Sequence, residues 1–154
     1  MREIELRGKS LVTNNWVYGN YIIDKWGDSN NEIIYGILQD RTAPDYLKNW
    51  IPVRVNPNTV GQYTGLKDKN DKKVFEGDVI RMHYFFDNYD PSSLGAFEDE
   101  AEIIGIVKCE LLDGFYVETV DDHSICYLQW VEEPVEELEV LGNIYDNPEL
   151  LEVE

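Results

Sequence analysis

Residues 60–80 read VGQYTGLKDKNDKKVFEGDVI, and this stretch decides the fold class. It holds two runs of β-forming residues separated by a charged corner at residues 68–72, and a second corner at residues 76–78 that leads into a further apolar run. Asn and Asp tolerate the left-handed backbone and hydrogen-bond to their own backbone, which makes them turn residues. We therefore expect a tight hairpin turn with a positive φ near Asn70 or Asp71.

Two functional interpretations of this stretch, a calcium site and an acid–base pair, fit the sequence less well than a turn does. The DKND run begins like a calcium-binding loop, but Lys73 stands where such a loop has glycine and Val79 stands where it has glutamate. Glu76 and Asp78 are two carboxylates close in sequence, as in an acid–base pair, but strand geometry argues against their pairing. Turn chemistry accounts for both corners.

The rest of the chain repeats this pattern of short period-two segments separated by Gly, Asn, Asp and Pro, which is typical of a mainly β protein. The clearest hairpin is IVKCELLDGFYVETV, residues 106–120, in which Asp113 and Gly114 supply the turn. We expect the first strand to pair inside the chain. The predicted strands are residues 2–7, 15–23, 32–39, 51–55, 60–66, 73–75, 78–85, 101–112, 115–119, 124–131 and 138–145.

The sequence predicts two parts, a small N-terminal β segment at residues 1–56 and a second domain at residues 57–154. Residues 86–100, FDNYDPSSLGAFEDE, are polar and aperiodic and contain Gly, Pro and Ser, so we expect a long mobile loop there. Asn147 before Pro148 matches a helix N-cap followed by the first helical position, which predicts a short C-terminal helix.

Charge is distributed very unevenly along the chain. The formal net charge is −18, and residues 1–96 contain 13 acidic and 12 basic residues, whereas residues 97–154 contain 18 acidic residues and one basic residue, Lys108. Such a surface repels phosphates, so we expect no direct nucleic-acid binding. The acidic half is either a solubilising face or a surface that binds a basic protein.

If the acidic half binds a partner, the densest carboxylate clusters are the candidate partner surface. These clusters are Glu98, Asp99, Glu100, Asp121, Asp122, Glu132, Glu133, Glu136 and Glu137.

Candidate residues for metal binding or catalysis are few. His83, Cys109, His123 and Cys126 are the soft ligands, but zinc sites usually show paired Cys-x2–4-Cys motifs, which this sequence lacks. There is no G-x-S-x-G nucleophile motif and no phosphate-binding glycine loop. We expect no metal, no cofactor and no catalytic residues, although an enzyme whose site lies around His83 or His123 stays open.

Five aromatic residues are concentrated near the N-terminus, and they could form a platform on which a base or sugar stacks. Core packing and cross-strand pairing are the commoner role of such residues, and we favour it here. The five are Trp16, Tyr18, Tyr21, Trp26 and Tyr35.

Several features indicate a soluble protein of a reducing cytoplasm. The opening MREIELRGKS is charged throughout, and no apolar run approaches the roughly 20 residues of a membrane helix. Two cysteines do not make a disulfide framework, so we expect both thiols to be free.

The run VGQYTGLKDKN followed by VFEGDVI resembles the central signature of the YopX family of phage and prophage proteins. The start, REIELRGK with NWVYG after it, and the end, EVLGNIYDNPELLE, resemble the terminal segments of that family. One departure is Asp71, where family members often have Gly. The resemblance implies a small bacteriophage-type protein in the cytoplasm of a bacterial host, with an N-terminal β segment and a C-terminal SH3-like β-barrel. It implies no activity, because the family is functionally uncharacterised.

Three hypotheses for the function follow. The first is a phage- or prophage-encoded non-enzymatic interaction module whose partner is a protein, with formation of a homo-oligomer left open. The second is an acidic nucleic-acid mimic that occupies a host DNA-binding protein, and competition by DNA would favour it. The third is a small enzyme with an unrecognised site, which a deep pocket around His83 or His123 would favour.

Overall fold

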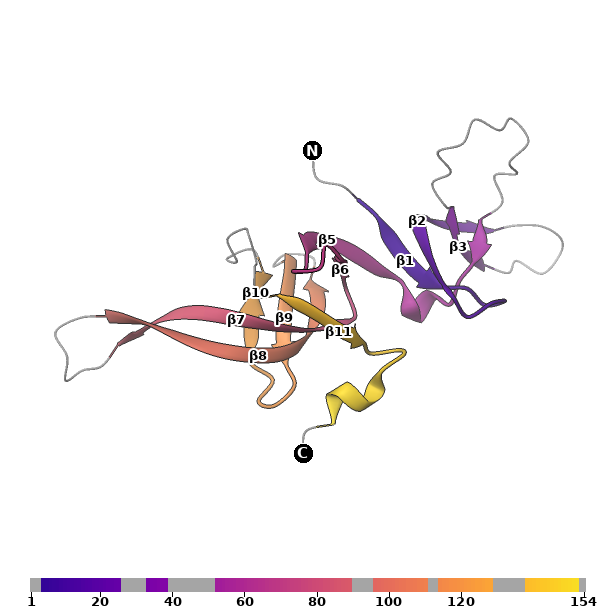
Figure 1. The fold of residues 1–154 in the computed structure, drawn as a ribbon. Helices are drawn as coiled ribbons and strands as arrows, with labels where there is room; N and C mark the ends of the chain where they lie inside the picture. The colour runs from indigo at the N-terminus through magenta and orange to yellow at the C-terminus, as the bar shows by residue number, and fades with distance from the viewer. Residues whose placement is uncertain are drawn as a thin grey trace. The chain divides into compact units, whose positions relative to one another are not determined.

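The protein is described by a computed structural model of the 154-residue chain, which covers residues 4–25, 33–38, 52–89, 96–110, 114–128 and 138–152. For residues 24–25, 33–34, 84–89, 96 to 100 and 101 it describes the backbone alone. The described residues form antiparallel β-strands and two short 3-10 turns, without an α-helix (Figure 1). This confirms the prediction of a mainly β protein.

The chain divides into two compact units, Met1–Gly65 and Leu66–Glu154. The division lies later than the boundary that we expected after residue 56, because residues 61–65 continue the sheet of the first unit. The strand that contains them, β5 (Gly61–Lys67), crosses the division, and β6 (Lys73–Phe75) follows it in strand order.

The first unit is a sheet with the strand order β4-β3-β2-β1-β5. Its other strands and its 3-10 turn are β1 (Leu6–Lys9), β2 (Trp16–Lys25), β3 (Ile33–Leu38), β4 (Val53–Arg54) and η1 (Pro57–Thr59). The short β1 lies between two partners, because Leu6 is opposite Gly19 of β2 and Gln62 of β5. The expectation that the first strand pairs inside the chain is therefore confirmed.

A small core on one face of this sheet explains two of the N-terminal aromatic residues. Val17, Ile37 and Val55 are buried, and Tyr21 and Tyr35 pack against them. The two tyrosine rings stack with centroids 6.3 Å apart, as expected for neighbours on adjacent strands. Tyr21 and Tyr35 therefore belong to the core.

Two further aromatic residues of this group lie elsewhere in the unit. The Trp16 ring lies 4.4 Å from the guanidinium carbon of Arg7 and 5.5 Å from the Lys9 ammonium, so it makes cation–π contacts with both. Tyr18 is exposed, and Trp26 lies outside the described residues.

The second unit is a five-stranded antiparallel sheet with the order β10-β9-β8-β7-β11. Its strands and its 3-10 turn are β7 (Asp78–Tyr89), β8 (Ala96–Glu110), β9 (Gly114–Thr119), β10 (Ile125–Tyr127), β11 (Glu139–Asn143) and η3 (Pro148–Leu151). Gly114 has φ 74°, as the predicted turn requires.

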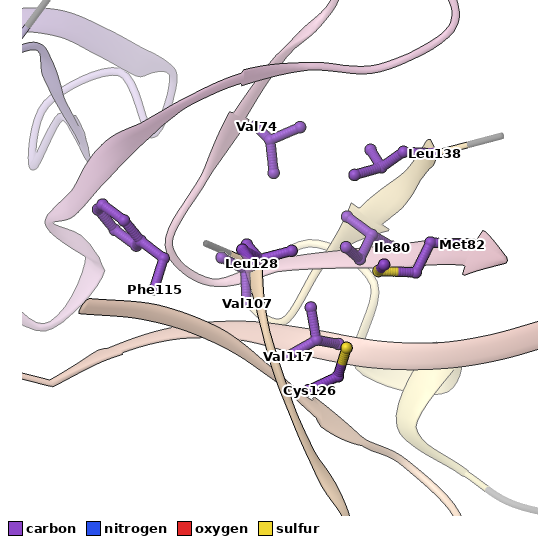
Figure 2. Packing of buried hydrophobic residues seen from close by; sticks show 9 residues of the cluster. All are labelled: Val74, Ile80, Met82, Val107, Phe115, Val117, Cys126, Leu128 and Leu138. Carbon is purple, nitrogen blue, oxygen red and sulfur yellow. The ribbon is translucent and has the colours of Figure 1, made fainter. Parts of the chain in front are cut away.

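The core of the second unit lies on one face of this sheet, as Figure 2 shows. Period two brings Val107 of β8 opposite Val117 of β9, and Val117 opposite Cys126 of β10. Val74 of β6 joins this cluster. The buried members of the core are Val74, Ile80, Met82, Val107, Phe115, Val117, Cys126, Leu128 and Leu138.

The charged corner at residues 68–72 is built around the buried carboxylate of Asp68. Its Oδ1 accepts hydrogen bonds from the backbone N–H groups of Asn70 (2.8 Å) and Lys72 (2.9 Å), and its Oδ2 accepts one from Val140 (3.2 Å). Asp71 has φ 64°, which confirms the predicted left-handed position. The corner is therefore a turn, and the Asp68 carboxylate also joins it to β11.

The second corner uses a carboxylate in the same way. Gly77 has φ 85°, and the Oδ2 atom of the buried Asp78 accepts a hydrogen bond of 2.8 Å from the backbone N–H of Phe75. Both corners are thus formed by turn chemistry, as the sequence indicated.

Three sequence predictions are wrong. The described strands do not close into a barrel, because the sheet of the second unit has β10 and β11 as its edges. Residues 86–89 and 96–100 are not a loop but paired strand, with Phe86 opposite Asp99; residues 90–95 lie outside the described residues. At the predicted C-terminal helix, Pro148–Leu151 form a single 3-10 turn in which the Asn147 side chain makes no capping hydrogen bond.

Replacing Asp68 with Asn should destabilise the protein by roughly 1 to 3 kcal/mol, because an amide cannot accept all three backbone hydrogen bonds. Burial opposes ionisation of Asp68, but the hydrogen bonds from Lys72, Val140 and Asn70 lower its pKa below the usual value. This stabilisation is present above the unfolded pKa of about 3.9 and is lost as the pH falls through the lower folded value.

Chemical denaturation of Asp68→Asn at several pH values measures both effects. The matched control is Asp71→Asn, which changes an exposed carboxylate of the same corner. A variant as stable as the wild type at pH 7 would show that the Asp68 carboxylate does not hold the corner.

Replacing Asp71 with Gly should leave the protein equally stable or more stable by up to about 1 kcal/mol. Glycine removes the left-handed penalty of about 1 kcal/mol. The lost ion pair with Lys67 (2.6 Å) joins exposed side chains and is worth about 0 to 1 kcal/mol. Thermal unfolding measures the difference, and a clear drop in Tm would reveal a further role of the Asp71 side chain.

Candidate functional site

The hairpin of β7 and β8 extends past the strands that flank it in the second unit. β11 pairs with β7 only between Asp78 and Arg81, and β9 pairs with β8 only from Gly105 onward. Residues 82–89 and 96–104 pair with each other, and within the described part of the chain no third strand joins them (Figure 1). We call these residues the arm.

The sequence of the arm explains why it forms strands despite its polar residues. Its first strand begins MHYFF and its second ends AEII, which are rich in aromatic and β-branched residues. The register is regular from Met82 opposite Ile103 to Tyr89 opposite Ala96. At its base the arm is anchored by Met82, which is fully buried, and by Ile103, which packs against the same core.

The arm has an extreme charge composition. Between Met82 and Val107 the sequence contains six carboxylates and no Lys or Arg. The register places Asp87 directly opposite Glu98, and like charges at opposite positions destabilise a strand pair. The arm therefore keeps a concentrated negative charge at some expense in stability.

One histidine accompanies these carboxylates. The His83 Nε2 atom lies 3.5 Å from the Glu102 Oε2 atom, and the Glu102 side chain is half exposed. This contact is an ion pair only when the imidazole is protonated.

Three cations of the second unit contact carboxylates that lie outside the arm. Lys69 donates to Glu139 at 2.8 Å, and the Arg81 Nη2 atom lies 3.6 Å from the same carboxylate. Lys108 donates to Glu118 on the neighbouring strand β9. The hydrogen bond from Lys69 lowers the pKa of Glu139, and the one from Lys108 lowers the pKa of Glu118. Glu139 and Glu118 thus have cationic partners close by, whereas the sequence of the arm supplies no Lys or Arg.

The first candidate cluster, Glu98, Asp99 and Glu100, lies on β8 within the arm. The second, Asp121 and Asp122, lies in the turn between β9 and β10. This turn adjoins the base of the arm, because the backbone N–H of Val120 donates to the Ile104 carbonyl at 3.0 Å. The remaining candidates, Glu132, Glu133, Glu136 and Glu137, lie outside the described residues.

Asp122 has a structural role that its sequence position did not reveal. Its Oδ1 atom accepts hydrogen bonds from the Thr119 hydroxyl and from the backbone N–H of Ser124 (3.0 Å). These contacts with Thr119 and Ser124 lower the pKa of Asp122 to about 2. The signal was present in the sequence, because Thr, Asp and Ser at this spacing are typical of a side-chain-capped turn. Asp121 is exposed, and its Oδ1 atom accepts a hydrogen bond of 2.8 Å from the Asp122 N–H.

The four soft ligands occupy different environments. Cys126 is buried in the core, and burial raises the pKa of its thiol to about 11. Cys109 packs against the same core, whereas the exposed His123 has φ 58° and lies 3.2 Å from Glu118. Within the described residues, no group of three or more His, Cys, Asp or Glu side chains could hold a metal ion.

The described residues also include no helix long and apolar enough to cross a membrane.

Comparison with known proteins places the chain in a family. The family model described as YopX protein matches residues 6–152, so the chain belongs to the YopX family. No curated protein matches it. Among solved structures, the chain is similar to the crystal structure of protein EF1440 from Enterococcus faecalis, with 23% sequence identity, a TM-score of 0.47, and coverage of 99% of this chain and 100% of that one.

The two members of the Asp121–Asp122 cluster should respond differently to substitution. Asp122→Ala removes the two hydrogen bonds that the Asp122 carboxylate accepts from Thr119 and Ser124 and should lower the Tm, whereas Asp121→Ala should have a much smaller effect. The contribution of Asp122 is present above its unfolded pKa, about 3.9, and is lost as the pH falls through its folded pKa, about 2. Equal losses of Tm in the two variants would contradict this assignment.

Proposed function

We propose that the protein is a phage- or prophage-encoded, non-enzymatic interaction module of the bacterial cytoplasm, and that it binds a basic protein through the arm. The observation that carries the proposal is the arm itself, which contains five carboxylates and one histidine but no Lys or Arg. Membership of the YopX family supports the setting through the resemblance described above.

The placement of the charge supports binding better than solubility alone. A solubilising charge works anywhere on a surface, whereas here Lys69, Arg81 and Lys108 contact carboxylates outside the arm and the sequence of the arm itself contains no Lys or Arg. A concentrated field of one sign accelerates association with a partner of opposite sign and makes it salt-dependent. A basic partner would also relieve the repulsion between Asp87 and Glu98.

The nature of the partner separates this function from the second hypothesis. If the basic partner is a DNA-binding protein, the carboxylates of the arm would occupy the site that normally receives phosphates. DNA would then compete with the arm for the partner, whereas a partner that uses another surface would stay bound.

A pair of charge-matched variants tests the proposal. Glu98→Lys with Glu100→Lys changes the arm, and Glu149→Lys with Glu152→Lys changes exposed positions in η3 and directly after it by the same amount of charge. Each protein is immobilised and exposed to a bacterial lysate at two salt concentrations, with and without a DNA duplex. We expect the wild type and the η3 variant to retain basic proteins, with loss at high salt, and the arm variant to lose them.

Capture of the same proteins by both variants would overturn the proposal, because the arm would then contribute nothing specific. Equal loss in both variants would also overturn it, because binding would then depend on net charge alone.

A further inference from the structure

The geometry points to the outer edge of β8 in the arm as a docking line for an extended segment of the partner, with Lys or Arg at every second position. This inference rests on the proposed function and deepens it. It specifies the mode of binding, which is addition of a strand to the sheet, and the sequence pattern that the edge accepts.

Two backbone hydrogen bonds establish which groups of β8 face outward. The Ile104 carbonyl accepts from Val120, so the backbone groups of Ile104 face the side on which β9 lies. The Val107 carbonyl accepts from Gly77 at 2.8 Å, so residues of the other parity face β7. Since the backbone groups of a strand alternate in direction, residues 98, 100 and 102 face outward, and residues 97, 99, 101 and 103 face β7.

In this stretch, every residue whose backbone N–H and C=O groups face away from β7 is a glutamate. These residues are Glu98, Glu100 and Glu102. The residues between them, Asp99 and Ala101, direct their N–H and C=O groups toward β7. Acidic residues therefore coincide with the positions at which a further strand would form its hydrogen-bonded pairs.

No described strand occupies this edge. The pairing of β9 with β8 ends where Thr119 lies opposite Gly105, and the chain then turns at residues 120–124 toward β10. An unpaired edge is a template for a further strand. A strand added beside residues 98–102 would continue the line of β9 along the arm.

The glutamates determine which strand can be added. Antiparallel pairing of two copies centred on Glu100 would place Glu100 opposite Glu100 and Glu98 opposite Glu102, and like charges at opposite positions disfavour such a pair. A segment with Lys or Arg at alternate positions would place a cation opposite each glutamate. The edge thus disfavours a second copy of this chain and favours a basic extended segment.

Two synthetic peptides of identical composition test the pattern. One alternates three lysines with Val and Thr, and the other has the same lysines in one block. Binding to the whole protein is measured by fluorescence anisotropy, and the exchange of backbone amides on β8 is measured with and without peptide. We expect the alternating peptide to bind at least tenfold more tightly and to slow exchange at Glu98, Glu100 and Glu102.

A matched pair of variants separates the backbone contribution from the charge. Glu100→Gln removes one charge and keeps the N–H, whereas Glu100→Pro removes the same charge and the outward N–H, which an edge strand tolerates. We expect the Gln variant to weaken binding of the alternating peptide a fewfold and the Pro variant to weaken it at least tenfold more. The exchange measurement uses the wild type, so it tests whether the peptide protects the β8 amides even if the Pro variant fails to fold.

Equal affinity of the two peptides, together with unprotected amides, would overturn the docking line. If the arm variant still loses its basic partners in the capture experiment, the proposed function stands and only the mode of binding fails. Failure of both experiments would overturn the two proposals together. Protection of the amides by the alternating peptide alone would support the docking line.

Discussion

The buried carboxylate of Asp68 is the contact on which the second unit depends. It gathers three backbone N–H groups, two from its own corner and one from Val140 of β11. The backbone repeats this link, because Lys69 donates to the Leu138 carbonyl at 2.9 Å. Since β11 pairs with β7 and Leu138 is fully buried in the core, one acidic residue fixes the corner, the edge strand and part of the core together.

The same corner also determines which carboxylates of the second unit have a lysine partner. It brings Lys67 and Lys69 to the side of the unit where Asp71 and Glu139 lie, and Arg81 of β7 reaches the latter. The hairpin that follows Arg81 contains no Lys or Arg before Lys108. Apart from Lys108, the lysines of the second unit thus lie at or beside the corner that stabilises it, and none lies in the arm. This uneven placement leaves the arm acidic, and the arm is the surface that we propose for binding.

Much of the fold was predictable from the sequence because it follows local rules. Asn and Asp at residues 68–71 indicated the turn, and Asp71 has the expected left-handed backbone. The hairpin around Gly114 and its buried face follow from period two. The link from Asp68 to Val140 was not predictable, because it joins residues that are far apart in the chain and that no pattern connects.

The outer part of the arm, residues 86–89 and 96–100, was missed for a different physical reason. Asp, Pro and Gly are residue types of turns and loops, and Asp87, Pro91 and Gly95 mask the strand-forming tendency of Phe86 and Phe97 in the sequence. The barrel was expected from the family resemblance, but strand order shows an open sheet. The acidic clusters were visible as composition, yet only the structure shows that Asp122 serves a turn while Glu98 and Glu100 lie on an extended hairpin.

The buried thiol of Cys126 gives the second unit a chemical reporter of its own. Its pKa of about 11 leaves almost no thiolate at neutral pH, so alkylating reagents react with this thiol only when the core opens. Both cysteines of the chain lie after Leu66, and the half-buried Cys109 is the more accessible of the two. The rate at which a second label is incorporated therefore measures opening of this unit, while the first unit contributes no signal.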